Sequence, residues 1–416
     1  MLDRRRGCAR RCWWSVLIAL AVLAAASAAH AETTVTIGAI YPLAGRADAR
    51  WAIETAAEII NTPHPGLEGL PLGAGQGLPG LGKAKLAVVF TDDLDNPSVA
   101  QAQVLRLVTQ DHVAALIGAG ADAETLAATT LGEHHGIPFL VPDASAPGIT
   151  GRGYGWVFRT TPLARDIAAA NTRFLSQLKA AGSKIETIAI VGDDTAAAAE
   201  IDTALHDAAA QAGFASFSLR YRADAGDLSP VVQELRSKNP DAVIVHAAPG
   251  AAQLLVTTMN TIGYKPPVMI ADDAGFSGGD FIAAAGNLAQ GLIDRSVWSR
   301  GAPGSATAVV NDLYRSKSGR DLDDRSAQVL QGVLVLADAI GRAGSTDPGA
   351  IRDALRRTDL KSDQLIVGYD GVKFDATGRN TLAATDLTQL QGKQYVTVWP
   401  PERAAGKLTL PFRGAE

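Results

Sequence analysis

Apolar and polar positions along the chain predict an alternation of strands and helices. The strand candidates are short runs that are apolar throughout, which is typical of parallel strands buried on both faces of a sheet. They lie at residues 34–40, 85–91, 114–117, 137–141, 187–191, 216–221, 242–246, 268–271 and 291–298. Helix-type segments lie at residues 49–60, 98–110, 122–135, 165–181, 196–212, 228–237, 250–262 and 325–341. This alternation predicts doubly wound α/β units, in which ligands bind beyond the C-terminal strand ends.

Two stretches depart from the alternation. Residues 63–82 are rich in Gly, Pro and Leu and show neither a helical nor a strand period. We expect them to form a surface insertion between the first helix and the second strand. The C-terminal part changes to strands and turns, with strand character at residues 371–375 and 395–399 and a turn at 376–379.

The first 31 residues are typical of a cleaved signal peptide. Five arginines precede a short apolar run at residues 15–26, and Ala-His-Ala at 29–31 supplies the small residues that signal peptidase requires. We therefore expect cleavage after Ala31 and export to the periplasm. Cys8 and Cys12 precede the apolar run instead of following it, which argues against a lipoprotein anchor.

Removal of this segment changes the charge and the cysteine content of the chain. It takes away five of 38 basic and one of 43 acidic residues, so that 385 residues with a net charge of −9 remain. An acidic chain is a poor candidate for binding nucleic acid or an anionic membrane. Both cysteines leave with the segment, so we expect no disulfide. A chain of this length is expected to form two domains.

Several segments, in order along the chain, resemble the branched-chain amino acid class of periplasmic binding proteins. They are IGAIYPLAG at 37–45, TDDLDNP at 91–97, ALIG at 115–118, GIP at 136–138, VPDASA at 141–146, GYGWVFRTTP at 153–162, LSPVV at 228–232, NPDAV at 239–243 and GVKFDATG at 371–378. No single segment decides the matter, but their order and spacing cover nearly the whole mature chain.

The resemblance implies a type I binding-protein fold, with two doubly wound parallel-sheet lobes joined by a hinge of three crossovers. The first lobe would comprise residues 32–156 and 284–364, and the second lobe residues 157–283 and 365–416. A small solute would bind between the lobes, and the closed form would dock on an inner-membrane ABC permease. The resemblance implies no cofactor, no metal and no catalytic activity.

Residues 118–123 formally fit the dinucleotide fingerprint G-x-G-x-x-A, and Asp143 follows at a plausible distance. The fingerprint alone is weak evidence, and the export signal and the surrounding resemblance argue against a nucleotide. Both interpretations share a helix N-terminus whose free N–H groups face a cleft. A nucleotide-dependent enzyme is thus the alternative from a different functional class, and the one we favour least.

The resemblance implies ligand contacts at Tyr41, Ala121 and Asp122 in the first lobe. A hydroxyl residue commonly helps to hold the ligand's α-carboxylate at about position 122, where this chain has an aspartate that would repel a carboxylate. Two interpretations of Asp122 stay open. It caps the following helix, or it meets a cationic or hydrogen-donor group of the ligand.

Asp143, Ala144 and Ser145 match the family's second binding loop. The Ser145 hydroxyl and nearby backbone N–H groups are candidates to receive a carboxylate or carbonyl oxygen of the ligand. Asp143 either lines the cleft or makes a local turn.

The second lobe departs further from the family pattern. The turn at Asp194 is followed by Ala196 where an aromatic residue is common, and Ala247 stands where a tyrosine is common. These small residues predict a wider pocket or a bulkier ligand. Asp273 matches the acidic residue that pairs with a ligand amine, although a solvated turn aspartate is an equal alternative.

Together these features predict a periplasmic solute-binding component of an ABC importer, with an amino acid or a related small polar solute as its ligand. The missing aromatic residues leave an aromatic or amide-type solute as a second hypothesis. A ligand sensor with the same fold is a third.

Overall fold

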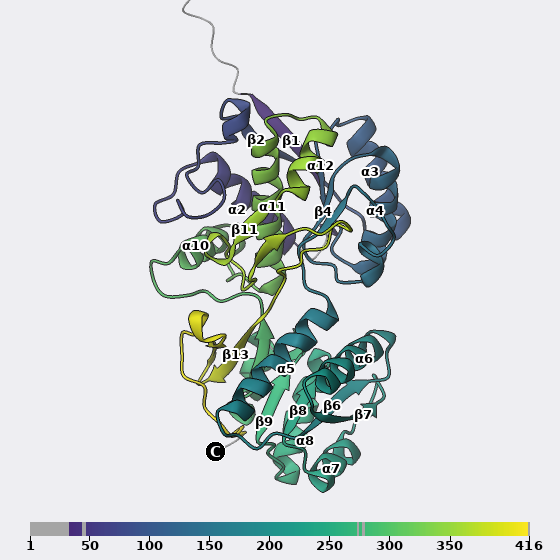
Figure 1. Ribbon diagram of the computed structural model, residues 1–416, viewed down its shortest axis with the longest axis vertical. Helices are drawn as coiled ribbons and strands as arrows, with labels where there is room; N and C mark the ends of the chain where they lie inside the picture. The colour runs from purple at the N-terminus through teal and green to yellow at the C-terminus, as the bar shows by residue number, and fades with distance from the viewer. Residues whose placement is uncertain (1–32, 44–46, 273, 277–278, 415–416) are drawn as a thin grey trace, which may run out of the picture.

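Two large β-sheets, each flanked by helices, organise the chain (Figure 1). The computed structural model describes residues 33–43, 47–272, 274–276 and 279–414. The predicted signal peptide lies outside these residues. Within the described ranges, no helix has the length and apolar character needed to cross a bilayer.

Five parallel strands form the first sheet, in the order β2-β1-β3-β4-β5. They are β1 (Thr34–Ile40), β2 (Lys85–Thr91), β3 (Leu116–Gly118), β4 (Phe139–Val141) and β5 (Val157–Arg159). Successive side chains of β1 enter two different cores. Ile37 and Ala39 pack in a core with α2 (Asp48–Asn61) and α11 (Asp324–Ala343). Ile40 packs on the opposite face, with α3 (Pro97–Thr109) and α4 (Asp122–His135). Burial on both faces explains the uniformly apolar strand.

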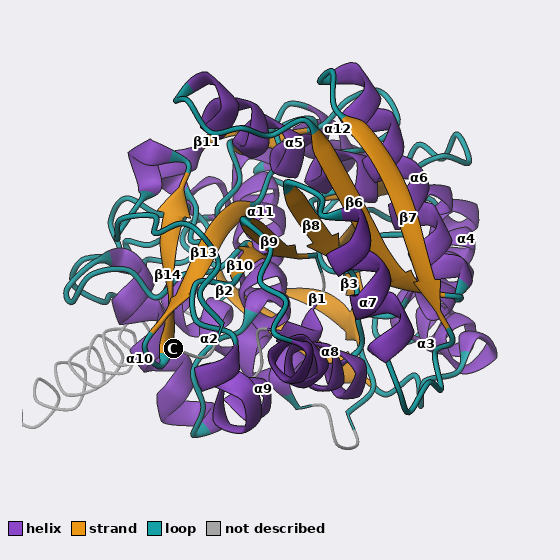
Figure 2. Cartoon of the chain, turned by 90° about the horizontal axis from the view of Figure 1, so that it is seen from below, coloured by secondary structure: helices purple, strands orange, loops and turns teal. Residues whose placement is uncertain are grey.

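The second sheet has seven strands in the order β14-β13-β10-β9-β8-β6-β7. Its strands are β6 (Thr187–Asp193), β7 (Ala215–Tyr221), β8 (Ala242–Val245), β9 (Val268–Ala271), β10 (Ile293–Ser296), β13 (Asp386–Gln391) and β14 (Gln394–Trp399). β6 to β10 are parallel, whereas β13 and β14 are antiparallel additions at one edge. The helices α5 (Ala164–Ala180) and α6 (Ala196–Gln211) cover one face, and α7 (Ser229–Lys238) and α8 (Pro249–Ile262) cover the other (Figure 2).

Both sheets have the same doubly wound strand order. β7-β6-β8-β9-β10 in the second sheet repeats β2-β1-β3-β4-β5 in the first. In this order the direction of winding reverses between β1 and β3, and again between β6 and β8, and ligands bind beyond the carboxyl ends of the strands at such points. The predicted α/β fold class is confirmed, and the topology directs attention to the loops after these four strands.

The remaining helices and strands lie in the C-terminal third of the chain. They are α9 (Gly279–Ala285), α10 (Ala306–Ser318), α12 (Pro348–Arg356), β11 (Asp359–Lys361) and β12 (Gly371–Lys373). The hydrophobic pattern predicted strand character only at β12. The pattern did not predict the three helices. α9 and α12 have only seven and nine residues, which leaves few positions from which a helical period can be recognised.

The chain passes three times between the two sheets. It leaves the first sheet after β5, returns after β10 to the helices that pack on that sheet, and enters the second sheet again at β13. The boundary expected at residue 284 put β10 with the first lobe, but β10 pairs with β9 and β13. The boundary expected at residue 365 put β12 with the second lobe, but β12 pairs with β11 and its Val372 packs in the first core. The lobe to which such a short strand belongs depends on pairing strands that are distant in the sequence. A local sequence pattern carries no information about those strands.

The Gly- and Pro-rich stretch at 63–82 lies between α2 and β2, as expected, and consists mainly of turns. It is more than a surface insertion, however. Leu67 and Leu78 are completely buried in the first core. Gly80 lies so close to α11 that a Cβ atom there would come within 2.1 Å of the Gly341 carbonyl oxygen. The stretch therefore covers part of the first core.

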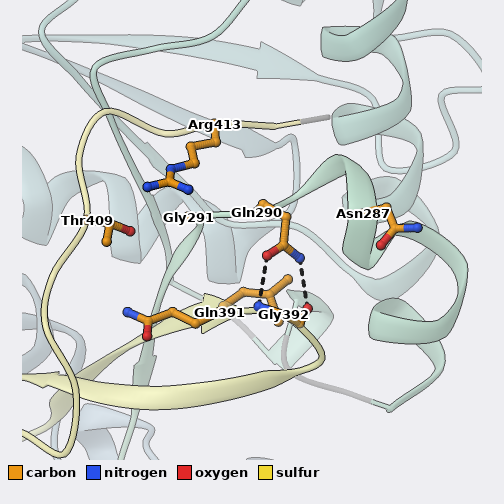
Figure 3. A pocket seen from close by; sticks show the side chains of 8 residues that line it. Asn287, Gln290, Gly291, Gln391, Gly392, Thr409 and Arg413 are labelled. Carbon is orange, nitrogen blue, oxygen red and sulfur yellow. Dashed lines mark hydrogen bonds between the residues drawn. The ribbon is translucent and has the colours of Figure 1, made fainter. Parts of the chain in front are cut away.

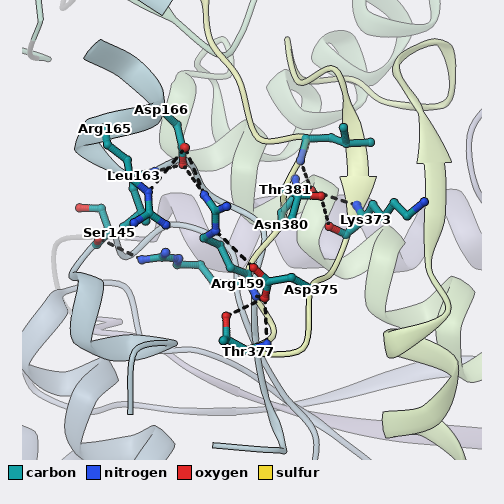
Figure 4. Close-up of polar contacts among 12 residues, drawn as sticks. Ser145, Arg159, Leu163, Arg165, Asp166, Lys373, Asp375, Thr377, Asn380 and Thr381 are labelled. Atoms are coloured by element: carbon teal, nitrogen blue, oxygen red, sulfur yellow. Dashed lines mark hydrogen bonds and ion pairs between the residues drawn. The ribbon is translucent and has the colours of Figure 1, made fainter. Parts of the chain in front are cut away.

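Polar contacts join two of the crossovers (Figure 4). Arg159, the last residue of β5, donates its N–H to the Gly378 carbonyl and accepts a hydrogen bond from the Asn380 N–H. The buried Asn380 side chain also donates to the Thr160 and Gly371 carbonyls. Two crossover segments that are far apart in the sequence thus lie side by side at the junction of the lobes.

Candidate functional site

The loops after β1, β3 and β4 meet at the C-terminal edge of the first sheet. They carry all the residues that the sequence predicted as ligand contacts in the first lobe: Tyr41, Ala121, Asp122, Asp143, Ala144 and Ser145. This edge includes the reversal point between β1 and β3, where doubly wound sheets bind their ligands. The residues predicted for the first lobe therefore lie at the edge of the sheet that the topology indicates.

A buried cluster of Tyr41, Asp143 and Arg325 forms the base of this site. The Tyr41 hydroxyl donates to Asp143 Oδ1 over 3.2 Å. Arg325, from the first turn of α11, donates its Nε to Asp143 Oδ2 over 3.0 Å. The Asp143 side chain is inaccessible to solvent, whereas 42% of the Arg325 side chain is exposed. The Arg325 side chain is thus partly open to solvent, while the Asp143 carboxylate that it contacts is buried.

Burial and charge pairing act in opposite directions on these groups. Burial raises the pKa of Asp143, and the adjacent Arg325 opposes that effect. Burial raises the pKa of Tyr41 well above its ordinary value, and Asp143 raises it further. Burial would lower the pKa of Arg325, but the Asp143 carboxylate more than compensates and leaves that pKa raised. The arginine therefore stays cationic and Tyr41 stays a neutral hydrogen-bond donor.

A cavity of about 230 Å³ opens beside this cluster. It is lined by Tyr41, Pro42, Asp48, Ala49, Asp323, Arg325 and Ser326. Gly120, at φ +86°, allows the β3 loop to approach, since a Cβ atom there would lie 2.5 Å from Arg325 Nη2. The cavity therefore lies between the end of β1 and the start of α11, and the Arg325 guanidinium group forms part of its wall.

Asp122 does not cap helix α4, so the capping interpretation is wrong. Ala121 is the N-cap residue and makes no side-chain cap, while Asp122 is the first residue of the helix. Its Oδ1 instead accepts two hydrogen bonds of 2.9 Å from the N–H groups of Ser145 and Ala146. The aspartate thus binds the very backbone donors that were candidates to receive a ligand oxygen.

The Ser145–Ala146 segment is also held from its other side. Arg159 is completely buried and donates its Nη1 to the carbonyl oxygens of Ser145 and Ala146, over 3.0 and 3.1 Å. Burial lowers the pKa of Arg159 to about 10, and Asp166 and Asp122 are the carboxylates that oppose this effect. Ser145 is exposed at the edge, whereas Ala144 is buried in a core.

The predicted residues of the second lobe are less well grouped. Asp194 is exposed, and its Oδ1 accepts a hydrogen bond of 3.0 Å from the N–H of Ala223, so it holds the loop after β7. Ala196 is the first residue of α6. Ala247 is completely buried and packs in the core of the second lobe.

Asp273, the predicted partner of a ligand amine, lies outside the described residues. Its neighbour Asp272 is 4% exposed, and its Oδ1 lies 3.6 Å from Nε of Arg295. Asp272 follows β9 at the C-terminal edge of the second sheet, as Asp143 follows β4 in the first. Each sheet therefore carries an aspartate–arginine pair at this edge.

A larger cavity, of about 540 Å³, lies elsewhere on the second lobe (Figure 3). Gln290 spans part of its wall through two hydrogen bonds of 2.9 Å with the backbone of Gly392. The cavity borders the start of β10 and the turn after β13, which is the edge opposite to the ends of β6 and β8. Its position is therefore unlike that of ligand sites in doubly wound sheets, despite its size.

Metal ligands do not gather at the site. Among the residues that the structure describes, no three His, Cys, Asp or Glu side chains form a group that could hold a metal ion.

A family model described as periplasmic binding protein matches residues 34–394, nearly the whole described chain. The chain belongs to the periplasmic binding protein family. It is 28% identical over 422 residues to "Leu/Ile/Val-binding protein homolog 7" of Brucella abortus (strain 2308), covering 95% of this chain and 99% of that protein.

Solved structures of this periplasmic binding protein fold are also similar. An ABC transporter substrate-binding protein from Desulfitobacterium hafniense in complex with Leu matches with a TM-score of 0.69 and 21% identity, over 88% of this chain and 99% of that one. A branched-chain amino acid transporter substrate binding protein from Streptococcus pneumoniae in complex with isoleucine matches with a TM-score of 0.67 and 20% identity, over 91% and 100%. At these identities the likeness establishes the fold.

Sequence reasoning missed two arginines of the candidate site. Arg325 lies within a predicted helix, far along the chain from Asp143, and carried no local signal. Arg159 lay inside the segment that resembles the family crossover, but nothing in the sequence indicated that it would hold the loop of Ser145.

Proposed function

We propose that the protein is the solute-binding component of an ABC importer and that it binds an amino acid or a related small polar solute between two lobes. The single observation that carries the proposal is the cluster of Tyr41, Asp143 and Arg325 beside a cavity at the β1/β3 reversal point. Membership of the periplasmic binding protein family agrees with it.

The division into lobes that we propose follows the sheets. The first lobe comprises the described residues up to β5 together with α10 to β12, and the second comprises α5 to β10 together with β13 and β14. The three connections between them form the hinge. Closure would require backbone changes at a few residues of these connections, which is the usual mechanism of two-lobed binding proteins.

The chemistry of the two edges supports a small polar ligand. Arg325 offers guanidinium donors on the first lobe, and the Ser145 hydroxyl and the Asp122 carboxylate lie on neighbouring loops. The pair of Asp272 and Arg295 lies at the edge of the second lobe. A solute that carries both donors and acceptors can form hydrogen bonds with both lobes, and these bonds stabilise the closed form.

The test is a thermal-shift screen over amino acids, their amides, amines and aromatic acids, followed by titration calorimetry. Binding to the native state raises Tm, and small-angle scattering should detect a smaller radius of gyration when the lobes close. Arg325→Ala should abolish the shift. Arg300→Ala, which removes an exposed ion pair with Asp312, is the matched control and should retain it. Turnover of a bound compound, or binding that Arg325→Ala leaves intact, would contradict the proposal.

Delivery to a permease in the inner membrane, and residence in the periplasm after cleavage at Ala31, are part of the same proposal. N-terminal sequencing of the protein from the periplasmic fraction tests the cleavage. Stimulation of a reconstituted transporter's ATPase activity by the loaded protein tests delivery. A sensor of the same fold would bind the solute but leave that ATPase activity unchanged.

A further inference from the structure

Asp122 occupies a pair of backbone donors on the loop after β4. Its Oδ1 accepts hydrogen bonds from the N–H groups of Ser145 and Ala146, each 2.9 Å long. Resting on the proposed function, we propose that Asp122 is a specificity-determining residue. Its carboxylate fills the place of a ligand carboxylate, so the solute meets this loop with a hydrogen-donor group, such as an amide or an ammonium.

The two N–H groups have the geometry of an anion site. Successive backbone N–H groups that converge on one oxygen favour a negatively charged acceptor, and bonds to a charged acceptor are short and strong. A carboxylate ligand would have to displace Asp122 and remain beside its charge. Two adjacent carboxylates repel each other, and the repulsion is strongest when closure of the lobes excludes water.

Hydrogen bonds on both sides fix the orientation of the backbone at Ser145 and Ala146. Arg159 holds the carbonyl oxygens of Ser145 and Ala146 while Asp122 holds their N–H groups. Nε and Nη2 of the buried Arg159 have no hydrogen-bond partner among the described residues. The Asp122 carboxylate is one of the charges that offset this cation. Loss of Asp122 would thus free two donors beside an incompletely compensated positive charge, which favours an incoming anion.

Asp122 also retains capacity for a ligand donor. Both of its hydrogen bonds within the described structure fall on Oδ1, and the residue is exposed. Oδ2 is therefore the acceptor that a ligand amide or ammonium would meet. The expected ligand class is a polar solute whose carboxylate, if it has one, binds elsewhere, for example at Arg325.

The test uses compounds that differ only in one group: leucine and leucinamide, phenylalanine and phenylalaninamide, benzoate and benzamide. Titration calorimetry should give the wild type a higher affinity for the amide of at least one pair. Asp122→Ala should gain at least tenfold for the carboxylate of that pair and lose affinity for the amide. Asp122→Asn removes the charge but can keep an oxygen on the two N–H groups, and it should not gain carboxylate binding.

Glu133→Ala is the matched control. Glu133 also binds two loop N–H groups, those of Gly155 and Trp156 over 2.9 and 2.8 Å, but at the other end of α4. It should lose stability without a change in ligand preference. An Asp122→Ala variant whose affinity for the carboxylates relative to the amides equals that of the wild type overturns this inference while the proposed function stands.

A second measurement does not depend on the ligand. Acetate alone, added to ¹⁵N-labelled protein, should shift the amide resonances of Ser145 and Ala146 in Asp122→Ala and not in the wild type. Unshifted resonances in the variant would contradict the anion site. If no compound binds the wild type or any variant, the proposed function fails, and the acetate result still decides whether Asp122 blocks an anion site.

Discussion

Arg325 and Asp143 form an ion pair of 3.0 Å although 182 positions separate them in the sequence. The pair links the first turn of α11 to the loop after β4, and Arg325 lines the cavity beside it. Because the carboxylate is inaccessible to solvent, its charge depends on this partner.

Arg325→Met should therefore destabilise the protein. Removing one partner of a buried pair costs about 3–5 kcal/mol, and we expect about 2–3 kcal/mol because 42% of the Arg325 side chain is exposed. Asp143→Asn in the Arg325→Met background should recover much of this loss, since no buried charge remains. Urea denaturation of both single variants and the double variant measures the coupling. Additive losses would mean that the pair does not stabilise the fold.

Asn380→Ala should loosen the junction of the lobes. The side chain donates to the Thr160 and Gly371 carbonyls and accepts from the N–H groups of Lys373 and Leu382. Leaving these groups unpaired should lower the free energy of unfolding by about 2–4 kcal/mol. Scattering should also show a broader distribution of lobe separations.

The control for that prediction is Asn61→Ala, which removes two hydrogen bonds to the Leu86 backbone inside the first lobe. It should cost about 1–2 kcal/mol and leave the scattering unchanged. Equal effects of the two variants on lobe separation would contradict a special role for Asn380.

Gly378→Ala should be far more damaging than Gly392→Ala. Both glycines have positive φ, +81° and +67°, which costs an alanine about 1 kcal/mol. A Cβ atom at residue 378 would also lie 2.0 Å from the Val157 carbonyl oxygen, whereas nothing lies within 4 Å at residue 392. We expect a loss of about 3 kcal/mol or more for Gly378→Ala, measured by thermal denaturation. Similar losses for both would show that the crossover backbone moves aside.

Asp93→Asn should raise stability at neutral pH. Burial raises the pKa of Asp93 to about 6 from an ordinary value of 3.8. The folded state therefore holds this proton more tightly than the unfolded state, and the free energy of unfolding falls as pH rises from about 4 to about 6. The fall is at most about 1.4 kcal/mol per pH unit for one group.

In Asp93→Asn this contribution disappears, so the pH dependence between 4 and 6 should become flatter. Denaturation at several pH values measures it. Asp386, whose pKa burial also raises to about 6, should retain its own share of the slope.

The order of strands and helices was largely predictable from the sequence. β1 and β2 begin and end at the predicted residues, and α4 does as well, because uniformly apolar strands and a glycine after a helix are strong local signals. The loops that carry Tyr41, Asp122 and Asp143 were predicted on the same basis, from their position after apolar runs and from the resemblance to a family.

The partners of those residues were not predictable. The amide donors of Ser145 and Ala146 lie 23 and 24 positions beyond Asp122, and only the close approach of the segments that follow β3 and β4 brings the Asp122 carboxylate to them. In the same way, only packing of α11 on the sheet brings Arg325 to Asp143.

The sequence by itself determined the class of fold, the family and the edge of the first sheet that carries the site, because these depend on periodicity and on residues near one another in the chain. The tertiary structure decided which lobe β10 and β12 join, that Ala247 belongs to a core, and what Asp122 binds. Those outcomes depend on hydrogen bonds and packing between distant segments, and such contacts exist only once the chain has folded.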